Sequence, residues 1–249
     1  MQEKLNTAPG FTIPVLDHGF VRYIDHMGTD MRILEAARIS YRSPSKGEEA
    51  DKKLLQYLFK NRHTSPFEMC KITFNIKMPI FVMRQFVRHR MQNLNEVSAR
   101  YTELPAEFYH PTAWRPQDPK NKQGSKDVGH WNPFIPGWGQ ESAGDILAEL
   151  YSEAYRTYEK LLEAGVSREM ARFCLPVGIY TEIYCCWDLK NLLHFFSLRD
   201  DPHAQWEHQQ YGKAMKEIAR ALFPWTLEAY DRYKFPCVDM AECPGERGV

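Results

Sequence analysis

Residues 72–101 read ITFNIKMPIFVMRQFVRHRMQNLNEVSARY and carry the pattern that decides the fold. Apolar side chains recur at every second position from Ile72 onward, which predicts a β-strand with one buried face. Pro79 suits the first position of a helix, and a helix is therefore predicted over about 79–91. After Asn93 the period returns to two, which predicts an extended segment at the end of this stretch.

The rest of the chain mixes helices with a few strands. The same periodicities predict a strand within 11–24, a helix capped by Asp30, a helical stripe over 54–59, a helix from about 142 to Gly165, a strand over 177–185, a helix capped by Asp188 and a helix over about 203–222. These elements do not alternate as in a doubly wound sheet, so the sequence indicates an α+β fold.

Residues 111–139 differ from the rest, because they hold five Pro and four Gly in 29 positions. This composition predicts a long irregular loop. A loop of this length serves either as a lid or interaction surface or as a simple insertion, and the sequence leaves both interpretations open.

The overall composition is that of an ordinary globular domain. The 249 residues are 43% hydrophobic, and 32 basic side chains balance 32 acidic ones. A net charge of zero excludes a bulk polybasic binder of nucleic acids or membranes, although it allows a local basic site. The first residues lack the pattern of a signal peptide, no apolar run is long enough for a membrane helix, and no C-x-x-C pair occurs. We therefore expect a cytoplasmic protein with no membrane partner, no nucleic-acid partner and no bound metal.

The densest polar cluster lies at 84–101, where four arginines and a single carboxylate, Glu96, give a local charge of +3. Guanidinium groups bind phosphate through paired, charge-assisted hydrogen bonds. Apolar residues are interleaved with these arginines, so part of the segment is buried, and a buried guanidinium needs an anionic partner. The cluster predicts an anion site, with a solvated basic face as the alternative. On the predicted helix, Gln85, Arg88 and His89 share one face.

A second polar cluster lies at 194–211. His203 and Glu207 are four residues apart, a spacing that allows a metal site but equally allows His203 to stand as a cap at the start of a helix. Arg199 is a further candidate for contact with an anion.

A third patch, at 62–68, has the spacing of a capping box, with Ser65 three residues before Glu68. This interpretation leaves His63 without a structural role. The phosphate-binding and nucleophile motifs of Rossmann, P-loop and α/β-hydrolase proteins do not occur.

A triad of Ser98, His89 and Glu96 is possible on paper, but the three lie within one short stretch, which gives a nucleophile relay poor geometry. Two alternative functions remain open. One is a non-catalytic module that binds nucleotides or single-stranded nucleic acid through the arginine cluster. The other is a hydrolase that uses His89 or His203 with carboxylates.

The segment RHRMQNLNEVSARY at 88–101 resembles the RHR-x-x-S-x-N-E-x-S-x-R-Y signature of flavin-dependent thymidylate synthases. Four further blocks resemble this family in its order: HTSPFE at 63–68, PIFVMRQFVRHR at 79–90, REMARFCLP at 168–176 and LRDDPHAQWEHQQY at 198–211. The resemblance covers most of residues 16–235, with the 111–139 loop as a variable insertion.

The resemblance implies a single domain over 1–249, built as an α+β fold with a central, mostly antiparallel sheet and flanking helices. It implies the reductive methylation of dUMP to dTMP, with 5,10-methylenetetrahydrofolate as the one-carbon donor and NADPH-reduced FAD as the hydride source. It also implies a homotetramer whose active sites are shared between subunits.

The resemblance further implies roles for individual residues. Arg199 and His63 match catalytic positions, and Arg199 would stabilise negative charge on the uracil ring. The residues that match cofactor-binding positions are Ser40, Ser65, Arg88, His89, Arg90, Glu96, Asp188, Lys190, His194 and His203. The residues that match substrate-binding positions are Gln85, Arg88, Glu96, Ser98, Arg100, Tyr101, Arg172 and Arg199.

Three positions depart from the family pattern. Asn93 stands where the signature has its first Ser, and an amide can replace a hydroxyl as donor and acceptor. Asp188 and Lys190 stand where some members have Asn and Arg. We expect altered contacts to phosphate and to the adenine end of the cofactor at these positions.

Overall fold

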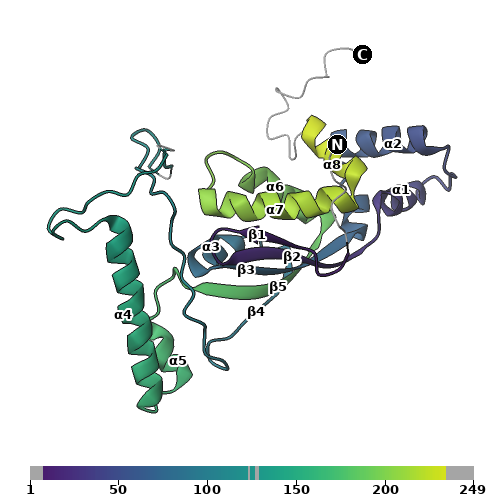
Figure 1. Cartoon of the computed structure of the whole chain (residues 1–249). Coiled ribbons are helices and arrows are strands. Elements are labelled where there is room, and N and C mark those ends of the chain that lie inside the picture. The colour runs from purple at the N-terminus through teal and green to yellow at the C-terminus, as the bar shows by residue number, and fades with distance from the viewer. Residues whose placement is uncertain (1–7, 123, 127–128, 234–249) are drawn as a thin grey trace.

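The computed structural model describes residues 8–122, 124–126 and 129–233. Its centre is a five-stranded antiparallel sheet in the order β1-β2-β3-β5-β4, with helices packed against it (Figure 1). The strands are β1 (Thr12–Val15), β2 (Gly19–Met27), β3 (Lys71–Pro79), β4 (Asn93–Glu96) and β5 (Tyr180–Asp188). The helices are α1 (Asp30–Arg38), α2 (Glu48–Lys60), α3 (Ile80–Phe86), α4 (Ala143–Glu163), α5 (Arg168–Ala171), α6 (Leu189–Arg199), α7 (Trp206–Leu222) and α8 (Pro224–Tyr233), with 3-10 turns η1 (Ser65–Met69) and η2 (Arg172–Cys174). This architecture confirms the predicted α+β class.

The central strand β3 confirms the alternation that predicted it. It pairs with β2 along one edge and with β5 along the other. Ile72, Phe74, Ile76 and Met78 are fully buried. Figure 1 shows α6 and α7 lying across one face of the sheet, and their apolar side chains share one core cluster with those of β3 and α8. Removal of this apolar area from water is the main force that holds the helices on the sheet.

The predicted strand within 11–24 is in fact two strands, because β1 and β2 form a hairpin. Gly19 opens β2 at a point where several segments meet closely. A Cβ atom at Gly19 would lie 2.6 Å from the Val15 carbonyl oxygen and 2.8 Å from that of Lys77. Only glycine fits such an approach of backbone to backbone.

Asp30 does not cap α1, and the prediction that it does was wrong. Thr29 occupies the N-cap position of α1 without a side-chain hydrogen bond. The Asp30 carboxylate instead accepts hydrogen bonds from the backbone N–H groups of Trp225 at 2.9 Å and Thr226 at 3.2 Å, and from the Thr226 hydroxyl at 2.6 Å. It therefore satisfies donors in the first turn of α8, a helix that lies almost 200 residues further along the chain.

The helix predicted over 79–91 is shorter than expected, because α3 ends at Phe86. Pro79 stands at its N-cap position. The inward face of α3 is apolar, but a longer helix would carry Arg90 toward the same side as Phe86. Burial of that guanidinium would be costly, so the chain turns outward and then enters β4. The extended segment predicted after Asn93 is confirmed over β4. It does not continue to Tyr101, because the N–H of Tyr101 donates to the Ser98 carbonyl at 2.9 Å and closes a turn.

Residues 111–139 form neither helix nor strand in the part of this segment that the structure describes, which confirms the irregular loop. The following helix, α4, begins with a capping box in which Ser142 and Asp145 exchange hydrogen bonds. Gly165 follows its end with a φ of +82°, as expected of a C-cap glycine. No helix among the described residues combines the length and apolar character needed to cross a membrane.

Candidate active site

A cavity of about 550 Å³ opens where α3, the C-terminal end of α6 and the start of α7 meet. Its lining contains two guanidinium groups and several amides but no carboxylate among the described residues. The larger polar side chains of this lining are Gln85, Arg115, Arg199, His203, Gln205 and Gln209. A cationic wall with amide groups suits an anionic ligand that also carries hydrogen-bonding ring atoms.

Arg199 and His89 form the polar pair beside this cavity. The Arg199 Nε donates to the His89 Nε2 at 2.9 Å, although the two residues are 110 positions apart. Burial, the Arg199 charge and nearby His194 lower the pKa of His89 to about 4. Because His89 is neutral at pH 7, its proton lies on Nδ1 and Nε2 is free to accept. The Arg199 charge is therefore oriented without being neutralised, and it is available to an anion.

This arrangement predicts a loss of stability in acid. The unfolded chain binds a proton at His89 near pH 6.5, but the folded chain does so only near pH 4, so unfolding takes up a proton between these values. The stabilisation is present above pH 6.5 and is lost as the pH falls toward 4. Because His89 is half-buried and solvent screens part of the repulsion, we expect the free energy of unfolding to fall by about 1–2 kcal/mol over this pH range.

Urea denaturation at about pH 7 and about pH 4.5 measures this effect. The wild type should lose more free energy of unfolding between the two pH values than His89→Gln, which keeps an acceptor for Arg199. His130→Gln, at an exposed position of the 111–139 loop, is the matched control. Equal losses in the wild type and in His89→Gln would contradict the buried neutral state of His89.

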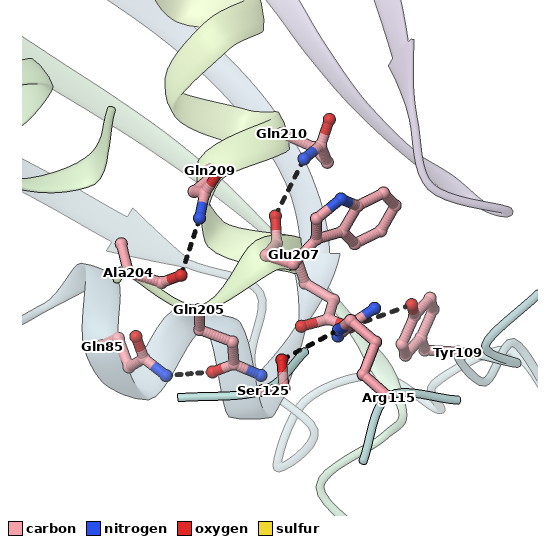
Figure 2. Close-up of polar contacts among 10 residues, drawn as sticks. Gln85, Tyr109, Arg115, Ser125, Ala204, Gln205, Glu207, Gln209 and Gln210 are labelled. Carbon is pink, nitrogen blue, oxygen red and sulfur yellow. Dashed lines mark hydrogen bonds and ion pairs between the residues drawn. The ribbon is translucent and has the colours of Figure 1, made fainter. Parts of the chain in front are cut away.

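Two side chains fix the Gln85 amide: Gln205, which precedes α7, and His208, which lies within α7. Its Nε2 donates to the Oε1 of Gln205 (Figure 2). Its own Oε1 lies 3.4 Å from the Nδ1 of His208. His208 is fully buried, and burial followed by the charge of Arg199 holds its pKa far below the usual range. A neutral His208 that donates from Nδ1 leaves the orientation of the Gln85 amide defined.

A second cavity, of about 520 Å³, lies between α1, α2 and η1. Three residues with predicted roles line it: Ser40, His63 and Ser65. The His63 ring is exposed and stacks on Tyr57 with ring centroids 5.9 Å apart and an interplanar angle of 19°. The cavity thus presents several hydroxyls, those of Ser40 and Ser65 among them, and a flat ring surface, which suits a ligand with phosphate and aromatic parts.

The capping box predicted at Ser65 is wrong. Thr64 stands at the N-cap of η1, and no side chain caps this turn. Glu68 instead lies 3.4 Å from the Nζ of Lys190. Asp188 caps α6 as predicted, since it accepts from the backbone N–H of Asn191 at 2.9 Å. Its predicted role in cofactor binding stays a prediction, as does that of Lys190.

The remaining predicted residues lie around β4 and the segments that follow it. The Glu96 carboxylate accepts from the Thr181 hydroxyl at 2.7 Å, and Arg100 pairs with Glu169 at 3.2 Å. Tyr101 is 80% exposed. The others of this group are Arg88, Arg90, Ser98 and Arg172, of which the first two are exposed. Asn93 is the first residue of β4 and is also exposed.

The predicted site residues are thus divided among three regions of one chain. The two cavities share no lining residue. Gln85, Arg199 and His203 line the first cavity, with His89 beside it, while Ser40, His63 and Ser65 line the second. The substrate-binding candidates around β4 line neither cavity. One chain by itself does not assemble the whole predicted site.

The triad and the metal site that the sequence allowed are not supported by the geometry. Glu96 bonds to Thr181, and His89 bonds to Arg199, so the drawn triad with Ser98 has no relay of hydrogen bonds. His203 lies 2.9 Å from Asp201, away from Glu207, which pairs with a different residue. Among the described residues, no three His, Cys, Asp or Glu side chains lie where they could hold one metal ion.

Three residues of the first cavity region had no specific role predicted from the sequence: Arg115, Gln205 and His208. Gln205 and His208 lie within the polar run of 194–211, so a signal for them was present. Arg115 lies in the irregular 111–139 loop, where no periodicity points to a role.

The sheet, its covering helices and this cavity define an α+β protein with a cationic, amide-lined ligand site. A family model described as "Thymidylate synthase complementing protein" matches residues 22–225. A flavin-dependent thymidylate synthase of Thermus thermophilus is 47% identical over 222 residues, which cover 89% of this chain and 79% of that protein. The corresponding protein of Thermotoga neapolitana is 43% identical over 223 residues, or 90% and 95% of the two chains. The chain therefore belongs to the flavin-dependent thymidylate synthases.

Solved structures agree with this assignment. The UMP/dUMP methylase PolB from Streptomyces cacaoi, bound with 5-Br dUMP, has a TM-score of 0.73 and 30% sequence identity to this chain. The match covers 88% of this chain and 97% of PolB. The fold implied by the sequence resemblance is thereby confirmed.

Proposed function

We propose that this protein methylates dUMP at C5 of the uracil ring to give dTMP. 5,10-Methylenetetrahydrofolate is the proposed one-carbon donor, and FAD reduced by NADPH is the proposed hydride source. Membership of the flavin-dependent thymidylate synthases supports the reaction, and the nucleotide analogue bound to PolB supports a uridine nucleotide as substrate. The observation that carries the proposal is the Arg199 charge, held by a neutral His89 at an amide-lined cavity.

Arg199 supplies the main electrostatic effect in this proposal. A guanidinium directed at the pyrimidine ring stabilises the negative charge that develops there, and this makes C5 more nucleophilic. Its Nε is engaged by His89, so its remaining N–H groups can face the ring. Gln85 holds the ring by hydrogen bonds, because its amide is already oriented by Gln205 and His208. Ser98, despite its hydroxyl, serves binding and not nucleophilic attack.

We assign the second cavity to the flavin dinucleotide. The Ser40 and Ser65 hydroxyls and the exposed His63 ring would hold its polar and flat parts. The exposed guanidinium groups of Arg88 and Arg90 are available to its phosphates. When bound, the reduced flavin supplies the hydride that completes the methyl group.

We further propose a homotetramer with active sites shared between subunits. Several of the separated site residues are flanked by large apolar side chains exposed to solvent. These are Ile39 and Tyr41 beside Ser40, Met91 and Leu94 beside Arg90, and Met170 and Phe173 beside Arg172. Exposed apolar surface of this kind marks interfaces. Assembly would cover it and would bring the separated groups together. Light scattering should give four times the mass of one chain.

The cytoplasm is the proposed location of this reaction. Cys70, Cys174, Cys185 and Cys186 are free thiols, as is usual in a reducing compartment.

Anaerobic NADPH oxidation tests the cofactor assignment. The purified protein should bind FAD and show the yellow flavin absorbance, and NADPH should bleach it at a rate that responds to added dUMP. Chromatography should then show dTMP only when the folate is also present. Salt-sensitive binding of an oligonucleotide without any flavin would favour the nucleotide-binding module instead.

A further inference from the structure

An ion pair connects the 111–139 loop to the first turn of α7. Arg115 of the loop donates from Nη2 to the Oε1 of Glu207 (Figure 2). The Arg115 Nε also donates to the Ser125 hydroxyl at 3.3 Å. The Arg115 guanidinium lies over the Trp206 ring, 5.0 Å from its centroid. One side chain of the loop thus contacts two consecutive residues of the helix.

The partner carboxylate is deeply buried, which makes this ion pair specific. Glu207 is only 3% exposed, and its Oε1 also accepts from the Tyr109 hydroxyl at 3.2 Å. Burial, followed by the Glu207 charge, raises the pKa of Tyr109, so this hydroxyl stays a donor. The Oε2 atom of Glu207 has no hydrogen-bond partner among the described residues. A carboxylate buried in this way depends on its cation, because removal of one partner leaves an uncompensated charge.

The same turn of α7 carries the residue that orients Gln85. Gln205 is the N-cap of α7 and immediately precedes Trp206. The Gln205 side chain makes no capping hydrogen bond, which leaves its amide free for Gln85, while the Gln205 carbonyl accepts from the Gln209 N–H at 3.0 Å. Arg115 fixes the next two residues, and Gln205 in turn accepts the hydrogen bond of Gln85. Arg115, Gln205 and Gln85 all line one cavity.

We propose that Arg115 is a positioning residue for the nucleotide, acting through Glu207, Gln205 and Gln85. The 111–139 loop is therefore part of the active site and not a simple insertion. This inference rests on the proposed function, because it takes Gln85 to contact dUMP. Loss of Arg115 should therefore weaken the binding of dUMP and leave the reduction of the flavin unchanged.

Calorimetric binding of dUMP to the FAD-loaded protein tests the proposal. Arg115→Ala should raise the dUMP dissociation constant about tenfold, as expected when a hydrogen-bonding group is no longer held in place. Arg115→Lys keeps the charge beside Glu207 and should recover a substantial part of the affinity. Lys122→Ala, which removes an exposed cation of the same loop, is the matched control and should bind as the wild type does.

Two double variants separate positioning from a merely structural role. Arg115→Ala/Glu207→Gln removes the unpaired buried charge, so it should regain stability against urea without regaining dUMP affinity. Arg115→Ala combined with Gln85→Ala should bind dUMP no more weakly than Gln85→Ala alone, because both changes act on one contact. Recovery of affinity together with stability, or additive losses in the second pair, would overturn the proposal.

Binding of dUMP to the wild type separates a failure of this inference from a failure of the proposed function. If the wild type binds no dUMP, both are wrong. If the wild type binds dUMP and Arg115→Ala binds it equally well, the inference alone is wrong.

Discussion

Arg199→Ala is expected to lower turnover of dUMP by about 100-fold or more while the protein stays folded. The Arg199 guanidinium is half-buried at the first cavity, and its only described hydrogen-bond partner is the neutral His89. Its charge is therefore not neutralised by a described carboxylate and is available to the ligand. Removal of a preorganised charge from a site shielded from water typically costs two to three orders of magnitude in rate, about 3–4 kcal/mol.

Steady-state kinetics with saturating folate and NADPH measure this loss. Arg199→Lys should fall between the wild type and Arg199→Ala, because an ammonium keeps the charge but not the fork geometry. Lys213→Ala, at an exposed position of α7, is the control and should keep full activity. A rate for Arg199→Ala within about threefold of the wild type would remove Arg199 from the chemistry.

Asp30→Ala is expected to destabilise the fold by about 3 kcal/mol. Asp30 is only 6% exposed and accepts three hydrogen bonds from Trp225 and Thr226 at the start of α8. Its removal leaves buried backbone donors without a partner, and it detaches α8 from the start of α1. Each unsatisfied buried donor costs about 1–3 kcal/mol.

Urea denaturation at neutral pH measures this effect. Asp30→Asn keeps the shape and one acceptor and should lose only part of the stability. Glu35→Ala, on the exposed side of the same helix, should change the free energy of unfolding by less than about 0.5 kcal/mol. If Asp30→Ala is no less stable than Glu35→Ala, the contact between α1 and α8 contributes little to stability.

Elements whose signal is local were predictable from the sequence. The alternation at Ile72–Met78 marks the buried face of β3, because successive side chains of a strand point to opposite faces. Asn75, on the opposite face, is buried as well. Asp188 caps α6, as its place just before a helical apolar face indicated. The failure at Asp30 has the opposite origin. A carboxylate beside a helix start is indistinguishable in sequence from a cap, and only the tertiary structure brings α8 within its reach.

The residues of the candidate site were likewise predictable only in part. Resemblance to the family identified Arg199, His89 and Gln85, and the structure places them at or beside one cavity. The separation of Ser40, His63 and Ser65 into a second cavity was not predictable. A pattern along the chain does not say which surfaces come together. Arg115 was missed because an irregular loop has no period, and its buried partner Glu207 looked like a candidate metal ligand instead.

Release of tritium from C5 of labelled dUMP reports the proposed methylation itself. The purified protein would be incubated anaerobically with 5,10-methylenetetrahydrofolate and NADPH, with and without added FAD. Tritium release should require both the folate and FAD. Absence of release from a protein that neither binds FAD nor responds to the folate would contradict the proposed methylation.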